Sequence, residues 1–370
     1  MRGTAILTLL ALFCPVSSAA EPGRDAKKLI EFGWDEPDTA FLRAHVAEME
    51  RTPFDGCVFH VYLVNENGKH VPFLWDAWGK KRFDEAQLRQ SVRELSQIPF
   101  KTFTHNFVRM NTAPADVDWF DDHSAILHNV RLMAQAARDG KCAGVLFDTE
   151  QYNGQLFDYP KQRDAKTKSW DEYAGQVRRR GNEVMEAFQE GYPDLTIFLT
   201  FGYSLPFVEA GGKPEKISQA HYGLLAPFLD GMVKAAAGKT RIVDGCELAY
   251  RYKEPAEFTK MYQTMSRGVM PIVRDPEKYR KAFSLGFGIW MDEDWRKHGW
   301  DTHDFSKNYF TPDQFGKSVK TALETSDEYV WVYTEKPKWW SETKSWWSVG
   351  CEPVDLPEAY ARALREAAGK

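Results

Sequence analysis

Cysteine pairs, blocks of basic residues and long apolar runs are all scarce in this sequence. No two of its five cysteines have the spacing of a metal site, and nothing indicates an obligatory disulfide framework. Lysine and arginine are dispersed along a chain whose formal net charge is -5, which disfavours a nucleic-acid partner. Beyond the first twenty residues, no segment is apolar and long enough for a membrane span. These absences disfavour a nucleic-acid-binding protein, a membrane-spanning chain and a disulfide scaffold.

The first twenty residues have the composition of a secretory signal peptide. Arg2 precedes an apolar run over residues 5–13, and small residues follow as far as the expected cleavage site at Ala19 or Ala20. We therefore expect an exported protein, periplasmic or extracellular. Lipidation at Cys14 is the less favoured alternative, because the residue before it is bulky.

Segments with the pattern of strands alternate with segments of helical period along residues 21–370. The predicted strands cover residues 29–33, 56–62, 101–107, 143–147, 195–203, 241–247, 285–291 and 329–333. Eight strands that alternate with helices predict an α/β fold, a single (β/α)₈ TIM barrel without a domain boundary. The alternative is an open doubly wound sheet, which would carry a glycine-rich phosphate turn after an early strand, and this sequence has none there.

The connections at the two ends of the predicted strands differ in length and composition. Those that enter the strands are short, for example residues 139–141 and 238–240, whereas most that leave them are long and rich in aromatic and acidic residues. Active sites of barrels are built from the loops at the C-terminal ends of the strands. The asymmetry therefore predicts a functional site at that face.

Asp148 and Glu150 end the apolar strand predicted over residues 143–147. Side chains alternate along a strand, so both acids project from the same face. Two carboxyl groups in this arrangement can provide a proton donor and a partner that tunes its pKa or orients a substrate. The alternative interpretation is a capped strand end, with Asp148 bonded to loop amides. Further candidate catalytic acids at predicted strand ends are Glu247, Asp292 and Glu335.

Aromatic residues accompany these acids. The chain has 13 Trp, 15 Tyr and 24 Phe, and flat rings of this kind stack on the faces of sugars. The candidate substrate-binding residues, which include two histidines, are Trp34, His60, Trp75, His105, Tyr152, Tyr203, Trp290, Tyr333, Trp339 and Trp340. The alternative for each is a core position or a loop pinned to the barrel rim.

Acids that converge from several strands on a Trp-lined cleft are the groups that glycoside hydrolysis uses. In these features the chain resembles the secreted (β/α)₈ glycoside hydrolases, whose acid/base often ends strand four. The resemblance implies Glu150 as general acid, a carbohydrate substrate, and no cofactor and no metal. It also implies a second carboxylate on strand six, seven or eight, for which Glu247, Asp292 and Glu335 compete. Thr149 stands where the best-known retaining members have Asn.

The segment from Asp148 to Glu150 is also similar to the D-x-E end of the strand-four motif in chitinase-like hydrolases. In that family the Asp orients the substrate's acetamido group, which acts as nucleophile, and the Glu protonates the leaving group. This sequence has Leu146 where the family carries a further Asp. The resemblance offers a mechanistic variant of the same hydrolase interpretation.

Two other function classes stay open at this point. A catalytically inactive barrel that binds glycans would keep the aromatic residues without a working pair of acids. A metal-assisted hydrolase or deacetylase would require Asp35, His60 and His105 to converge on one point. The patterns carry no information on the sugar, its linkage, the stereochemical course or the oligomeric state.

Overall fold

The computed structural model describes residues 27–294, 299–340 and 354–370. The expected signal peptide, Cys14 and Cys351 lie outside the described residues. Cys57, Cys142 and Cys246 are buried free thiols. None of the helices within the described ranges has both the length and the apolar character needed to cross a membrane.

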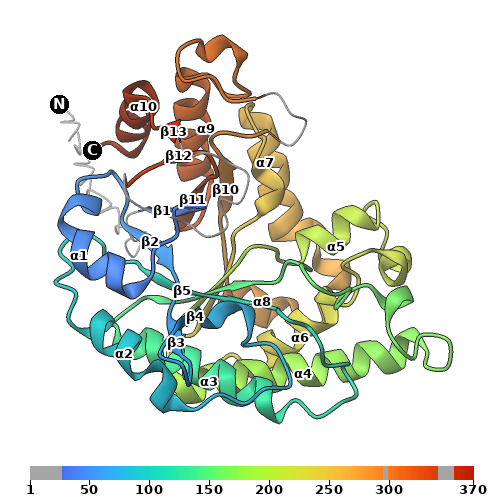
Figure 1. Ribbon diagram of the computed structural model, residues 1–370. Coiled ribbons are helices and arrows are strands. Elements are labelled where there is room, and N and C mark those ends of the chain that lie inside the picture. The colour runs from blue at the N-terminus through green and yellow to red at the C-terminus, as the bar shows by residue number, and fades with distance from the viewer. Residues whose placement is uncertain (1–26, 295–298, 341–353) are drawn as a thin grey trace, which may run out of the picture.

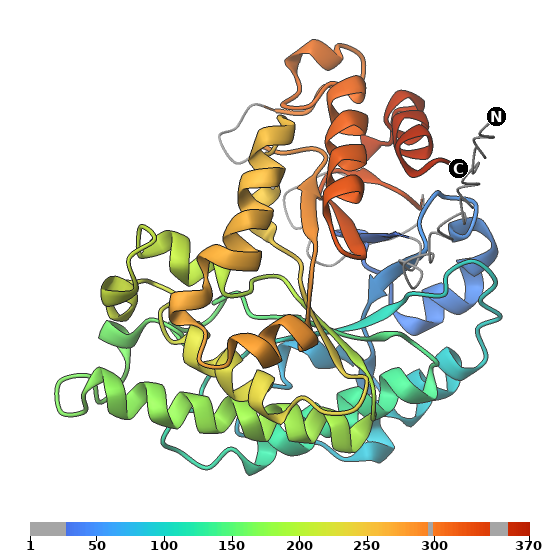
Figure 2. The ribbon, with the colours of Figure 1, turned by 180° about the vertical axis from the view of Figure 1, so that it is seen from behind.

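In this part of the chain, nine parallel strands form a nearly closed barrel with helices packed around it (Figures 1 and 2). The strands are β1 (Lys28–Gly33), β2 (Gly56–Phe59), β5 (Phe107–Asn111), β6 (Gly144–Asp148), β7 (Thr196–Leu199), β8 (Arg241–Asp244), β9 (Phe283–Leu285), β10 (Phe287–Trp290) and β11 (Tyr329–Thr334). The helices are α1 (Thr39–Met49), α2 (Glu85–Ser96), α3 (Ser124–Asp139), α4 (Trp170–Gly191), α5 (Ser204–Glu209), α6 (Leu225–Ala235), α7 (Pro255–Gln263), α8 (Pro276–Ala282), α9 (Pro312–Thr325) and α10 (Glu358–Ala368). The strand order is β10-β11-β1-β2-β5-β6-β7-β8-β9.

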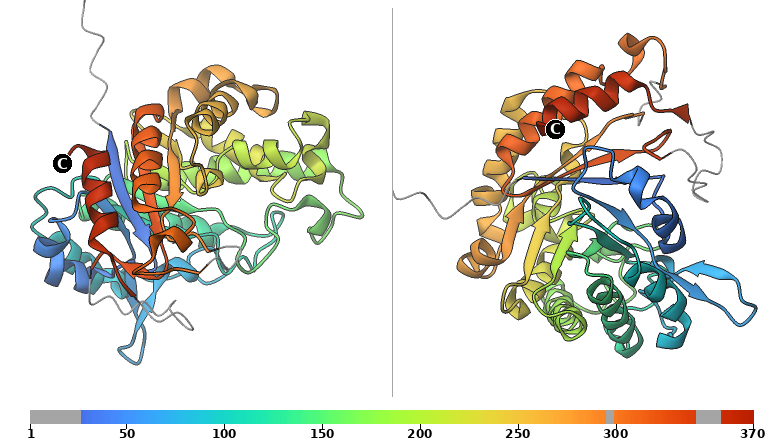
Figure 3. Two further views of the ribbon diagram at one scale, coloured as in Figure 1. Left: turned by 90° about the horizontal axis from the view of Figure 1, so that it is seen from above. Right: turned by 90° about the vertical axis from the view of Figure 1, so that its left-hand side faces the viewer.

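Two short sheets accompany the barrel. Strands β3 (Tyr62–Val64) and β4 (His70–Pro72) form an antiparallel hairpin that projects from the barrel (Figure 3). Strands β12 (Pro337–Lys338) and β13 (Val354–Asp355) pair in parallel after the last barrel strand.

Strands β9 and β10 together occupy one position in the barrel, because Gly286 alone separates them. β9 pairs with β8, and β10 pairs with β11. The amide of Gly286 donates to the carbonyl of Asp244 at 2.8 Å, and the amide of Asp327 donates to the carbonyl of Leu285 at 2.8 Å. The split strand thus joins the two edges of the sheet, and the predicted (β/α)₈ barrel is confirmed.

The barrel interior is filled mainly by aromatic side chains. The buried cluster inside it comprises Ile30, Phe32, Val58, Phe107, Leu146, Phe198, Val243, Tyr329 and Trp331. The large indole of Trp331 fits inside the barrel because two neighbouring residues, Gly245 and Gly288, have no side chain. A Cβ on Gly288 would lie 2.5 Å from its indole ring, and one on Gly245 would lie 3.0 Å from its Nε1. That Nε1 donates to the carbonyl of Gly245 at 2.7 Å, so the indole is buried with its polar group satisfied.

The strand predicted over residues 101–107 is wrong. The segment bends instead, with the amides of Lys101, Thr102 and Phe103 all donating to Oε1 of Glu50 at 2.5, 2.8 and 3.0 Å. The strand at this position is β5, which begins where the prediction ended. Its inward face carries Arg109 and Asn111 in place of apolar residues, and this removed the expected alternation.

Two carboxyl groups are completely buried on the outer side of β1. Glu31 and Asp35 are each 0% exposed, and Asp35 Oδ2 accepts from the amide of Trp339 at 2.7 Å. Burial, followed by repulsion from Asp35, raises the pKa of Glu31 well above its ordinary value of 4.5. Burial also raises the pKa of Asp35. The folded protein therefore keeps a proton here that the unfolded chain releases above about pH 4.5.

This buried pair predicts that stability falls as pH rises. Above pH 4.5 the unfolded chain binds fewer protons than the folded one, so the free energy of unfolding decreases by up to about 1.4 kcal/mol per pH unit for each retained proton. Glu31→Gln, which cannot ionise, is expected to remove this part of the slope between pH 5 and 8 in urea unfolding. The exposed Glu366→Gln should keep the wild-type slope. Equal slopes for wild type and Glu31→Gln would contradict the prediction.

Candidate active site

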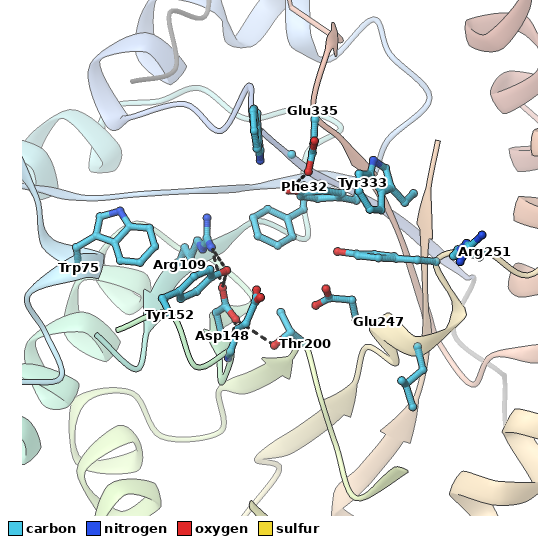
Figure 4. A pocket seen from close by; sticks show the side chains of 16 residues that line it. Phe32, Trp75, Arg109, Asp148, Tyr152, Thr200, Glu247, Arg251, Tyr333 and Glu335 are labelled. Carbon is cyan, nitrogen blue, oxygen red and sulfur yellow. Dashed lines mark hydrogen bonds and ion pairs between the residues drawn. The ribbon is translucent and has the colours of Figure 1, made fainter. Parts of the chain in front are cut away.

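A cavity of about 550 Å³ opens at the C-terminal ends of the barrel strands (Figure 4). Its volume is within the range of small-molecule sites. It is lined by Phe32, Gly33, Trp34, Trp75, Arg109, Asp148, Glu150, Tyr152, Thr200, Glu247, Leu248, Tyr250, Arg251, Trp290, Tyr333 and Glu335. The structure thus brings together nine of the residues selected from the sequence, namely Asp148, Glu150, Glu247, Glu335, Trp34, Trp75, Tyr152, Trp290 and Tyr333.

Asp148 is the best-connected side chain of the cavity. Its Oδ2 accepts from Arg109 Nη2 at 2.7 Å and from the Tyr152 hydroxyl at 2.8 Å. Its Oδ1 accepts from the Thr200 hydroxyl at 3.2 Å and from the amide of Glu150 at 3.0 Å (Figure 4). Both oxygens are therefore occupied as acceptors, and the group holds its neighbours in place.

Arg109 of β5 is a cavity residue that the sequence analysis missed. Its Nη1 donates to Glu36 Oε2 at 2.8 Å, and Glu36 Oε1 lies 3.0 Å from Nδ1 of His60. The side chains of Arg109, Glu36 and Asp148 are 9%, 0% and 1% exposed. Burial alone would raise the pKa of Glu36, but Arg109 and His60 together bring it below its ordinary value. A buried chain of side-chain contacts therefore runs from His60 through Glu36 and Arg109 to Asp148.

Three glutamates reach the cavity from three different strand ends, those of β6, β8 and β11. Burial, then the charge of Asp148, raises the pKa of Glu150. Burial, then the charges of Glu150 and Asp148, raises the pKa of Glu247 well above its ordinary value. Burial and Asp292 raise the pKa of Glu335 to about 7. Because like charges in one site oppose each other's ionisation, part of this group keeps its protons near neutral pH.

Two stacked tyrosines support two of these glutamates. The rings of Tyr250 and Tyr333 have centroids 5.3 Å apart and an interplanar angle of 16°. The hydroxyl of Tyr333 donates to Glu335 Oε1 at 3.2 Å, and a hydrogen bond from Tyr250 partly offsets the raised pKa of Glu247. Trp290 forms T-shaped contacts with both rings. Tyr250 was absent from the sequence prediction because it lies beyond the predicted strand, in the turn that follows Glu247.

Asp292, one of the candidate catalytic acids, does not line the cavity. It is 1% exposed and accepts from Trp290 Nε1 at 3.1 Å, from the amide of Glu335 at 3.0 Å and from the amide of Lys336 at 2.8 Å. The side chain thus fixes the backbone that carries Glu335. It is a positioning residue, since it has no face toward the cavity.

Neither candidate histidine lines the cavity. His60 is buried against Glu36 and reaches the site only through Arg109. His105 precedes β5, and its Nδ1 lies 2.9 Å from the hydroxyl of Tyr329, the first residue of β11, so it belongs to the opposite end of the barrel. Asp35, His60 and His105 therefore do not converge as a metal-assisted enzyme would require. Within the described ranges, no group of three or more His, Cys, Asp and Glu side chains is arranged to hold a metal ion.

Tyr203, Trp339 and Trp340 also lie away from the cavity. Strand β7 ends at Leu199, before Tyr203, whose hydroxyl donates to Asp230 Oδ1 at 3.0 Å among buried helices. Trp339 and Trp340 are 9% and 1% exposed, and Nε1 of Trp340 donates to the carbonyl of Asp35 at 2.8 Å. The two tryptophans pin the segment after β12 to the barrel, which was the alternative interpretation of this loop.

No protein-family model and no curated protein matches the chain. Among solved structures, it is similar to a GH5-4 broad specificity endoglucanase from Clostridum cellulovorans, with 11% identity over 93% of this chain and 95% of that one and a TM-score of 0.47. A Thermobacillus composti GH10 xylanase has 12% identity over 93% and 97% of the two chains and a TM-score of 0.45. A GH20 catalytic module of the pneumococcal exo-beta-D-N-acetylglucosaminidase StrH has 10% identity over 94% and 85%, and a TM-score of 0.44. The barrel itself is established by its strand pairing.

Proposed function

We propose that the protein is an exported glycoside hydrolase that cleaves a poly- or oligosaccharide by carboxylate general acid/base catalysis. The observation that carries the proposal is the presence of three glutamates with raised pKa values in one aromatic-lined cavity. Glycoside hydrolysis needs a protonated carboxyl group to donate to the leaving oxygen and an ionised one to attack carbon or activate water. Mutual repulsion among the glutamates provides both forms at the same pH.

Glu150 has the surroundings of the general acid. The charge of Asp148, which Arg109 holds in place, disfavours ionisation of Glu150. After burial, the charge of Glu150 contributes most to the raised pKa of Glu247. We assign the second carboxylate to Glu247, because ionisation of one member of this pair favours the protonated form of the other. Glu335 is left to contact the sugar.

Asp148 is less suited to the substrate-assisted variant. Both of its oxygens already accept hydrogen bonds from protein groups, Arg109 and Tyr152 on one side and Thr200 on the other. Binding of an acetamido group would displace one of these donors. The proposal therefore gives Asp148 a positioning role and leaves the attacking or water-activating role to Glu247.

The aromatic residues supply the sugar-binding surface. Trp75 and Tyr152 form a T-shaped pair on one side of the cavity, with ring centroids 5.0 Å apart. Trp290 and Tyr333 form another on a different side, with ring centroids 5.6 Å apart. Figure 4 shows Trp75 and Tyr152 beside Arg109, with Tyr333 across the cavity. Exposed ring faces in such a site stack on the apolar faces of sugars.

The test is release of reducing sugar or chromophore from a broad panel of glycans and aryl glycosides. Wild type is expected to cleave at least one member, and the Glu150→Gln/Glu247→Gln double variant, with the same fold by circular dichroism, to cleave none. The pH profile should be bell-shaped, with both limbs above the ordinary glutamate value of 4.5, because burial and repulsion raise both pKa values. A wild type that binds glycans and cleaves nothing would establish the inactive glycan-binding barrel instead.

A further inference from the structure

Two arginines are among the described residues that line the cavity, and their surroundings differ. Arg109 is 9% exposed and bridges two buried carboxylates, Glu36 and Asp148. The side chain of Arg251 is 34% exposed and lies at the edge of the cavity, on the side away from Trp75 (Figure 4). Of these two described arginines, Arg251 is the one that presents a solvent-accessible guanidinium to a ligand in this cavity.

Two contacts hold the Arg251 guanidinium in a fixed position. Its Nε lies 3.2 Å from Oε1 of Glu293, whose side chain is 0% exposed. Its Cζ lies over the ring of Tyr309, 5.0 Å from the centroid, and the hydroxyl of Tyr309 donates to the backbone carbonyl of Arg251 at 2.8 Å. The ion pair with Glu293 and the contact with the Tyr309 ring restrict the guanidinium, so it loses less entropy when a ligand binds.

Both signs of charge meet at this edge of the cavity. Lys253 lies over the same tyrosine ring, with Nζ 3.9 Å from the centroid, and the carboxylates of Glu293 and Glu257 lie near the two cations. The rest of the cavity carries Glu150, Glu247 and Glu335. An anionic group on a ligand is repelled by those glutamates, and its favourable position is beside Arg251.

The position of Arg251 relative to Glu247 is set by the chain. Glu247 begins the short helix η4 (Glu247–Ala249), and the turn continues through Tyr250, whose amide donates to the carbonyl of Glu247 at 3.0 Å. Arg251 directly follows this turn, and both Glu247 and Arg251 line the cavity. A ligand held at Glu247 is therefore in the same cavity as the Arg251 guanidinium.

We infer that Arg251 is a specificity residue that binds an anionic substituent of the sugar, a uronic acid carboxylate or a sulfate ester, and that the substrate is an acidic glycan. The planar guanidinium fits either group through paired N–H donors. The inference rests on the proposed function, because it names the substrate class of the same cavity. Arg251 has no part in the proton transfers assigned to Glu150 and Glu247.

The experiment is titration calorimetry with matched pairs of oligosaccharides. The Glu150→Gln protein is used so that the ligand is not consumed. Uronic acid trimers (galacturonic, glucuronic and mannuronic) are compared with their methyl esters, and sulfated oligosaccharides with their desulfated forms. The anionic member of at least one pair is expected to bind at least about tenfold more tightly, as for charge-assisted hydrogen bonds. The uronate and sulfate arms identify which anion is bound.

Variants then assign the preference to Arg251. Arg251→Gln is expected to reduce the ratio of the two affinities to within threefold. Lys253→Gln removes the same charge two residues away and should preserve most of the ratio, because its amine is directed at Tyr309. Arg251→Gln removes one contact of the buried Glu293, so Arg251→Gln/Glu293→Gln is measured as well. A preference that survives in the double variant overturns the inference.

The outcomes for the two proposals are separable. If wild type cleaves neutral glycans and no anionic member of any pair binds more tightly than its neutral partner, the inference fails and the hydrolase stands. If an anionic sugar binds through Arg251 and wild type cleaves nothing, the inferred site stands and the hydrolase fails. Absence of binding to every oligosaccharide overturns both.

Discussion

Glu150→Gln is expected to lower kcat/KM on unactivated glycosides by about 10²–10⁴-fold, the contribution usual for a positioned general acid. Glutamine keeps the shape of the side chain and removes the proton that the leaving oxygen requires. The loss should depend on the leaving group. Dinitrophenolate is a good leaving group and departs without protonation. On a dinitrophenyl glycoside, the same variant should therefore release dinitrophenolate with a kcat/KM within about tenfold of wild type.

Glu247→Gln supplies the contrast. A second carboxylate attacks carbon or activates water, and a good leaving group does not replace either role. This variant is therefore expected to lose activity on dinitrophenyl and unactivated glycosides alike. The comparison is made by measuring initial rates of both variants on a series of aryl glycosides whose leaving groups differ in pKa. If Glu150→Gln were equally impaired across the series and Glu247→Gln showed the dependence, the two roles would be exchanged.

Arg109→Met is expected to destabilise the protein by about 3–5 kcal/mol, the usual cost of removing one partner from a buried ion pair. The substitution removes the guanidinium that Glu36 and Asp148 share, and their side chains are 0% and 1% exposed. Urea unfolding monitored by circular dichroism measures the change. Arg109→Lys should recover only part of the stability, because an ammonium group does not reproduce the fork that joins two carboxylates.

A double variant separates charge from packing in this prediction. In Glu36→Gln/Arg109→Met one of the two carboxylates is neutral, so repulsion with Asp148 is removed while the methionine is retained. We expect this protein to be more stable than Arg109→Met alone. If the double variant were no more stable, the loss would come from the packing of the arginine stem against Phe32, over whose ring the guanidinium carbon lies at 4.8 Å.

The barrel could be predicted because its signals are local. The capping box that begins α4, for example, is formed by Ser169 and Glu172, three residues apart, and both of its hydrogen bonds are present. The acids Asp148 and Glu150 were found for a similar reason, since they directly follow an apolar strand. Neighbouring residues contain the whole pattern in each case.

The charge network behind Asp148 could not be predicted, because its members are far apart in the sequence. Arg109 lies 73 residues from Glu36 and 39 from Asp148. Its buried charge depends on both partners, and neither is visible in the local pattern of β5. A polar residue at an inward position reads as the end of a strand, so the prediction moved the strand toward residue 101. The burial of Trp339 and Trp340 likewise depends on Asp35, some 300 residues earlier.

The packed barrel interior has a consequence for turnover. Phe107, Phe198, Tyr329 and Trp331 fill the barrel interior, so the described part of the chain leaves no passage from the cavity through the barrel. In the proposed hydrolase, a product bound at the deep end of the cavity leaves through the same opening by which the substrate entered. The next substrate molecule binds only after the product has dissociated. The released sugar is then a competitive inhibitor, and its inhibition constant reports how tightly the inner end of the cavity retains what it has made.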